Sequence, residues 1–111
     1  MNRILILDDE DFICKLISKI ASKKGYLVDI SHNYPDALSY LSKINDYSFF
    51  FIDYNVDISS IQNISKIIRD NSNKTKIVLM SGIEESEIDM KNHYDIYIFK
   101  PELVEQVNKI L

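Results

Sequence analysis

Residues 4–10 read Ile-Leu-Ile-Leu-Asp-Asp-Glu, four apolar residues that lead directly into three acids. An uninterrupted apolar run of this length is typical of a strand covered on both faces, as in a parallel sheet between two layers of helices. Three further runs of this kind follow, at residues 49–52, 77–80 and 96–99. A weaker segment at residues 26–30 is interrupted by an acid, which suits an edge strand. The sequence therefore predicts five strands.

Helical patterns separate the predicted strands. Apolar residues recur at helical spacing in residues 11–24, 34–44, 59–70 and 102–111. Residues 84–92 are mostly charged or polar, so a helix there should be short and poorly anchored. Strands that alternate with helices imply right-handed crossovers and a doubly wound parallel sheet with helices on both faces. The expected fold class is α/β.

Composition places the chain among globular proteins. Of its 111 residues 46% are hydrophobic, which excludes a disordered chain, and no linker or repeat divides residues 1–111, so we expect one domain. The net charge of −4 gives no reason to expect nucleic-acid binding. A single cysteine, Cys14, excludes an internal disulfide, and no apolar run suits a signal peptide or a membrane span. We expect a cytoplasmic protein without a membrane partner.

Polar or charged residues stand at the ends of four predicted strands: Asp8-Asp9-Glu10, Asp53, Ser81-Gly82 and Lys100-Pro101. In a doubly wound sheet the carboxyl ends of the strands meet at one rim, where ligands bind. Taken singly, each motif is more often a helix cap, a turn or a strand exit. Their joint occurrence at four strand ends favours a common site.

Acids that converge in this way require a cation. Two carboxylates about 5 Å apart repel by roughly 3 kcal/mol at an effective dielectric constant of about 20. Carboxylate oxygens without His or Cys partners favour Mg²⁺ or Mn²⁺ over zinc, and Mg²⁺ leaves room for a phosphoryl oxygen. In phosphoryl transfer Asp53 can be the nucleophile, Lys100 can pair with a phosphoryl oxygen, and Ser81 can donate a hydrogen bond to another.

These motifs resemble the receiver domains of response regulators, in particular chemotaxis-regulator-like single domains, over essentially the whole chain. Leu-Ile-Leu-Asp-Asp-Glu is similar to the family's first strand and acidic pair, and residues 25–38 are similar to its second strand and the start of its second helix. The resemblance implies five strands in the flavodoxin-like order 2-1-3-4-5. It also implies a phosphoprotein that serves signal transduction in a two-component system or phosphorelay. Such a domain is not an enzyme with turnover, since it catalyses only its own phosphorylation and dephosphorylation.

The resemblance implies a chemical role for five residues. Asp53 accepts phosphate from a phosphohistidine on a histidine kinase or a histidine phosphotransfer protein, and Lys100 is the family's characteristic lysine. Mg²⁺ is bound by Asp9, by Asp53, by Asp8 through water, and by the backbone carbonyl of Asn55. The phosphorylated domain then binds a downstream protein.

The resemblance also implies a switch. Ser81 and Tyr97 match the family's switch hydroxyl and switch aromatic residue, and the Lys100–Pro101 bond is expected to be cis. The segment from Ser81 to Lys100 is short, which compresses the fourth helix next to this switch.

Two other functions stay open. A protein-interaction module that no longer depends on phosphorylation would explain the departures around the fourth helix. An aspartate-nucleophile phosphatase would use the Asp-x-Asp pattern of residues 9–11, although such enzymes usually have a larger fold. A dinucleotide-binding domain is disfavoured, because acids and not a glycine-rich turn follow the first strand.

Overall fold

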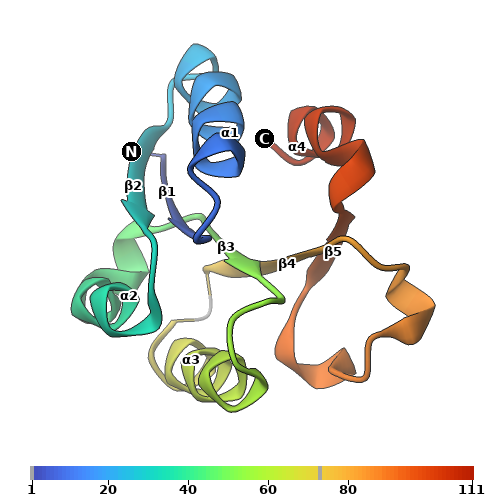
Figure 1. Cartoon of the computed structure of the whole chain (residues 1–111). Helices are drawn as coiled ribbons and strands as arrows, with labels where there is room; N and C mark the ends of the chain where they lie inside the picture. The colour runs from blue at the N-terminus through green and yellow to red at the C-terminus, as the bar shows by residue number, and fades with distance from the viewer. Residues whose placement is uncertain (1, 73) are drawn as a thin grey trace.

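The computed structural model describes residues 2–72 and 74–111. Its centre is a parallel sheet of five strands in the order β2-β1-β3-β4-β5, which runs through the molecule in Figure 1. The strands are β1 (Arg3–Leu7), β2 (Leu27–Ser31), β3 (Phe49–Asp53), β4 (Lys76–Ser81) and β5 (Ile96–Phe99). Every neighbouring pair is parallel. The predicted α/β class and strand order are therefore confirmed.

Helices cover both faces of the sheet (Figure 1). One face carries α1 (Asp11–Lys23) and α4 (Leu103–Ile110), and the other carries α2 (Tyr34–Tyr40) and α3 (Ile58–Asn71). The 3₁₀ helix η1 (Leu41–Asp46) continues α2, so the segment predicted at residues 34–44 is only partly α-helical. In the part of the chain that the structure describes, no helix is long and apolar enough to cross a membrane.

The apolar runs are uninterrupted because successive residues of a strand point to opposite faces. In β1, Leu5 and Leu7 pack on the side of α2 and α3, whereas Ile4 and Ile6 pack on the side of α1 and α4. All four are fully buried. In β2, by contrast, Leu27 is exposed and three residues are only half-buried, as an edge strand requires.

The connection between β4 and β5 differs from the prediction. The structure has two 3₁₀ turns there, η2 (Glu85–Glu87) and η3 (Lys91–His93), where we expected a short helix over residues 84–92. Ile88 and Met90 are buried in the core beside α3. Side chains two positions apart lie on one side of an extended chain but not of an α-helix. The only two apolar residues of this segment therefore favour an extended path over the core.

The exit from β5 also departs from the expectation. No peptide bond between described residues is cis, so the Lys100–Pro101 bond is trans and the cis expectation is wrong. Lys100, Pro101 and Glu102 form the 3₁₀ turn η4, which leads directly into α4. The fixed φ of proline suits the first turn of a helix, which accounts for the proline in this trans arrangement.

Candidate functional site

Residues at the carboxyl ends of three strands are in contact. Asp8 follows β1, Asp53 ends β3 and Lys100 follows β5. The Nζ atom of Lys100 lies 3.0 Å from Oδ1 of Asp53 and 3.1 Å from Oδ2 of Asp8. Parallel strands end at the same rim, which explains why residues so distant in sequence meet. The structure thus brings together the two acids and the lysine on which the sequence argument depends.

The two aspartates are buried and incompletely satisfied. Asp8 is fully buried and Asp53 is 1% exposed. The Glu10 N–H donates to Oδ1 of Asp8 at 2.8 Å, and the Asn55 N–H donates to Oδ1 of Asp53 at 3.3 Å. Among the described residues Oδ2 of Asp53 has no hydrogen-bond donor, and the only group beside Oδ2 of Asp8 is the Lys100 ammonium. Buried carboxylate oxygens without donors are costly, and a bound cation would remove that cost.

Four carboxylates form a candidate metal group. One oxygen each from Asp8, Asp9, Glu10 and Asp53 lies within 4.8 Å of the others. Asp9 and Glu10 are exposed, so the group opens to solvent on one side. An all-oxygen set with no His or Cys fits a hard divalent cation such as Mg²⁺. The residues present therefore fit the group that the sequence predicts, with Glu10 as a member to which the sequence argument gave no role.

Charge balance in the site depends on one ammonium. Burial raises the pKa of Asp8, the hydrogen bond from Glu10 N–H opposes this, and the neighbouring Asp53 charge adds to it. Burial lowers the pKa of Lys100, but the hydrogen bonds to Glu10 and Asp53 and the charges of Asp53 and Asp8 outweigh it, so the pKa is raised overall. Lys100 therefore remains charged at neutral pH and partly screens the acids.

Ser81 and Tyr97 are both hydrogen-bonded to Ile83. The Oγ atom of Ser81, at the end of β4, accepts a hydrogen bond from the Ile83 N–H at 3.2 Å. The Tyr97 hydroxyl donates to the Ile83 carbonyl. Ser81 is nearly buried and Tyr97 is half-buried. The two residues that the resemblance pairs in a switch are therefore connected through the backbone of a third residue.

No family model matches the sequence, and no curated protein matches it significantly. The response regulator protein TrrA from Thermotoga maritima, solved in complex with Mg(2+)-BeF, is 29% identical with a TM-score of 0.75, and all of each chain is covered. The CheY-like receiver domain from Methylobacillus flagellatus has a TM-score of 0.79 at 23% identity, over 99% of this chain and 95% of that one. The chemotaxis response regulator CheY4 of Vibrio cholerae reaches 0.80 at 20% identity, over 100% and 99%.

The chain has the fold of a response regulator receiver domain.

Asn55 lies in the turn after β3. Its N–H bonds the Asp53 carboxylate, and its side chain is exposed. The position is compatible with the expected role of its carbonyl as a metal ligand, and that role stays a prediction. Asp9 is likewise exposed beside Asp8, at the open side of the four carboxylates.

Two residues to which the sequence assigned no role border this site. Nδ1 of His32 lies 3.0 Å from the Asp8 carbonyl oxygen, so this ring nitrogen carries the proton. The Cys14 thiol donates to the same oxygen at 3.5 Å. Burial raises the pKa of Cys14 to about 11, so the thiol stays protonated, as expected for a core cysteine. The position of His32 directly after the strand beside β1 is the only signal that could have placed it here.

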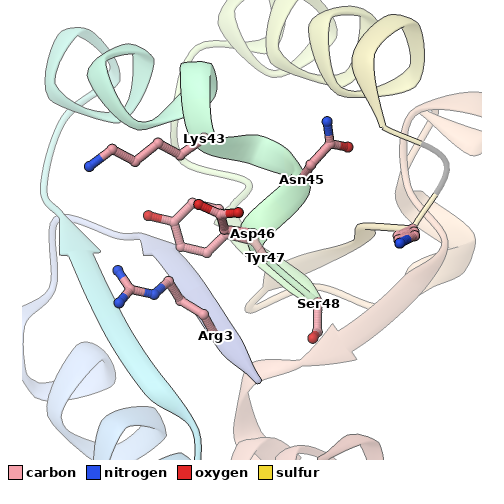
Figure 2. Close-up of a pocket in the computed structure, with 7 residues that line it drawn as sticks. Arg3, Lys43, Asn45, Asp46, Tyr47 and Ser48 are labelled. Carbon is pink, nitrogen blue, oxygen red and sulfur yellow. The ribbon is translucent and has the colours of Figure 1, made fainter. Parts of the chain in front are cut away.

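A polar cavity of about 700 Å³ lies at the opposite end of the sheet (Figure 2). Its lining comes from the segments that precede or begin β1, β3 and β4. The Asp29 carboxylate accepts hydrogen bonds from Arg3 at 3.0 Å and from the Tyr47 hydroxyl at 2.6 Å. These paired groups hold the edge strand β2 against β1. The cavity is therefore separate from the strand ends where the acids meet.

Proposed function

We propose that this chain is a phosphoryl-accepting receiver domain of a two-component system or phosphorelay. Asp53 takes the phosphoryl group from a phosphohistidine of a histidine kinase or a histidine phosphotransfer protein. The observation that carries the proposal is the Lys100 ammonium, 3.0 Å from Asp53 and 3.1 Å from Asp8, beside a buried Asp53 oxygen that lacks a donor. The Mg(2+)-BeF complex of the Thermotoga protein supports it.

The transfer needs few groups. A carboxylate oxygen of Asp53 forms the bond to phosphorus while the bond from phosphorus to the donor imidazole nitrogen breaks, and that electron pair returns to the ring. The product is an acyl phosphate on Asp53. Lys100, already at hydrogen-bond distance from Asp53, neutralises charge on the transferred oxygens. Ser81 donates its hydroxyl hydrogen to another phosphoryl oxygen.

The acidic group would bind one Mg²⁺. Asp9, Asp53 and the Asn55 carbonyl would hold it, with Asp8 assisting through water, and the ion would satisfy the buried Oδ2 of Asp53. The ion would supply charge neutralisation for an incoming dianionic phosphoryl group. Asp8 and Asp53 do the positioning, because both are fixed by backbone N–H groups at one carboxylate oxygen.

Signalling would begin at Ser81. When Ser81 turns toward the phosphoryl group, its hydrogen bond from the Ile83 N–H is lost. Tyr97 is tied to the Ile83 carbonyl, so its ring is coupled to that movement. The phosphate would thereby favour one of two states of the surface around β5, which a downstream protein binds.

Intact mass after incubation with phosphoramidate and Mg²⁺ tests the proposal. The expected result is the addition of one phosphoryl group that requires Mg²⁺ and is absent in Asp53→Asn. The charge-matched control Asp57→Asn, an exposed cap of α3, should be phosphorylated as the parent is. Phosphoryl acceptance would be excluded if the parent binds Mg²⁺ but gains no mass, and if beryllofluoride causes no change at Asp53.

A phosphorylation-independent interaction module is the second candidate. It is favoured by the 3₁₀ turns η2 and η3, which stand between β4 and β5 where we expected the fourth helix. In that case a partner would bind the Asp53→Asn variant and the parent equally, with or without phosphoramidate. Binding that increases only after phosphorylation of the parent would exclude this candidate.

A further inference from the structure

Lys100 has a third carboxylate partner, Glu10, outside the buried pair. Oε1 of Glu10 lies 2.8 Å from Nζ of Lys100, closer than either aspartate oxygen. The Lys100 side chain is 12% exposed and that of Glu10 is 53% exposed, whereas both aspartates are buried. The ammonium therefore lies between two buried acids and one acid at the surface.

The backbone of Glu10 is fixed while its side chain is free for this contact. Its N–H donates to Oδ1 of Asp8 at 2.8 Å, and its carbonyl accepts from the N–H groups of Ile13 at 3.1 Å and Cys14 at 3.2 Å. Glu10 occupies the N-cap position of α1, yet its side chain makes no capping hydrogen bond. Short polar residues usually fill that position because they cap. The longer glutamate instead reaches Lys100.

A cation beside Asp8 and Asp53 competes with Lys100 for the charge of these two carboxylates. Lys100 contacts Oδ2 of Asp8 and Oδ1 of Asp53, and the cation would take the free Oδ2 of Asp53. The lysine cannot leave easily, since its side chain is largely enclosed. A largely buried ammonium that loses its partners is strongly unfavourable. Glu10 supplies the one carboxylate contact of Lys100 that such a cation need not break.

We infer that Glu10 is the positioning residue for Lys100. It retains the ammonium when a divalent cation binds to Asp53 and, through water, to Asp8. The inference rests on the proposed function, because it concerns the metal and the lysine of that site. Glu10 thereby favours metal binding and keeps Lys100 beside the oxygen that receives the phosphoryl group. In the metal-free protein three acids hold Lys100. In the metal-bound form Asp8 and Asp53 also serve the cation, and Glu10 is the one of the three that serves Lys100 alone.

A double-mutant cycle on Mg²⁺ affinity tests this role. Calorimetric titration with Mg²⁺ at 0.15 M salt compares the parent, Glu10→Gln, Lys100→Met and the double variant. Loss of the Glu10 charge weakens Mg²⁺ binding in either background, because one negative charge that attracts the cation is removed. The contact of Glu10 with Lys100 adds to this loss only where Lys100 is present. The fold-decrease in Mg²⁺ affinity caused by Glu10→Gln should therefore be at least about threefold larger in the parent background than in the Lys100→Met background. An equal or larger loss in the Lys100→Met background would overturn the inference, since Glu10 would then act on the metal itself.

Two further measurements keep the test independent of folding and of phosphorylation. Proton exchange of the Lys100 ammonium, followed by NMR in the Mg²⁺-saturated protein, should be faster in Glu10→Gln than in the parent, and unchanged exchange overturns the inference. Asp11→Asn removes the neighbouring charge, which is paired with Lys15 at 2.9 Å, and should leave both readings unchanged. Phosphorylation is measured separately by mass. If the effects of the two substitutions on Mg²⁺ affinity are additive and phosphorylation is normal, only the role of Glu10 is refuted. If the two effects are coupled and no mass is gained, only the proposed phosphorylation is refuted.

Discussion

Arg69 on α3 reaches Asp95, the residue before β5, with 2.9 Å between Nη1 and Oδ2. The same carboxylate oxygen accepts the Ile77 N–H of β4 at 2.8 Å. Asp95 therefore joins a helix, a central strand and an edge strand at the start of β5. We expect Asp95→Ala to lower the free energy of unfolding by about 1–3 kcal/mol, because a half-buried N–H loses its acceptor. Urea unfolding measures this, and Asp89→Ala, at an exposed acid, should stay within about 0.5 kcal/mol. Equal loss in the two variants would contradict the assignment.

The stability that Asp95 contributes should depend on pH. Burial raises the pKa of Asp95, but the hydrogen bonds from Arg69 and from Ile77 N–H outweigh it, so the pKa lies below its usual value in the folded protein. A depressed pKa means that the contribution is fully present above the unfolded pKa of about 4 and is lost as pH falls through the folded value. The difference in unfolding free energy between the parent and Asp95→Asn should therefore shrink between pH 5 and the acid limit of folding. A difference that grows on acidification would contradict this.

Removal of Lys100 should destabilise the metal-free protein. Lys100→Met leaves Asp8 and Asp53 buried without their ammonium partner, and breaking a buried ion pair costs about 3 kcal/mol. Millimolar Mg²⁺ should restore much of this loss, because the cation replaces the missing charge. Urea unfolding with and without Mg²⁺ measures both effects. The control Lys109→Met breaks an exposed pair with Glu105 and should cost no more than about 0.5 kcal/mol. Full stability of Lys100→Met without metal would refute the prediction.

The segment between β4 and β5 should be held by Ile88. This side chain is 4% exposed, so Ile88→Ala should lower the free energy of unfolding by about 2–4 kcal/mol. Ile83, at 41% exposed, is the matched control, and Ile83→Ala should change stability by less than about 1 kcal/mol. Denaturant midpoints of the two variants decide the question. Similar values for both would mean that Ile88 does not pack in the core.

The amide of Ile83 should report on the proposed switch. Addition of beryllofluoride and Mg²⁺ is expected to shift its ¹H–¹⁵N signal, because Ser81 Oγ leaves the Ile83 N–H for the new ligand. In Ser81→Ala the Ile83 N–H has already lost its acceptor, so its signal should be displaced before any addition. Beryllofluoride and Mg²⁺ should then shift it much less than in the parent. Ser86→Ala, on the exposed turn η2, should respond as the parent does. An Ile83 signal that is unchanged in the liganded parent would show that the hydroxyl does not move.

Sequence patterns predicted the sheet because four of its five strands contain a short apolar run with a polar or charged residue directly after it. They predicted the contact of Asp8, Asp53 and Lys100 because parallel strands end at one rim. They could not predict contacts set by side-chain reach. Arg69 and Asp95 are 26 residues apart, and Glu10 meets Lys100 only because its side chain leaves the cap of α1. The short helix expected over residues 84–92 was a wrong prediction. It followed from the alternation of strands and helices, whereas the two apolar residues of this segment are two positions apart and suit an extended chain.

The extended path from β4 to β5 has a practical consequence. Only Ile88 and Met90 in its central part are buried, and the exposed acids of η2 contribute nothing to the core. Exposed turns of this kind are where chains accept inserted sequence. A short tag or a fluorescent reporter placed between Ser86 and Glu87 should therefore leave the strand-end acids undisturbed. It would sit close enough to Tyr94, whose hydroxyl binds Glu85 at 2.8 Å, to turn a rearrangement of this surface into an optical signal.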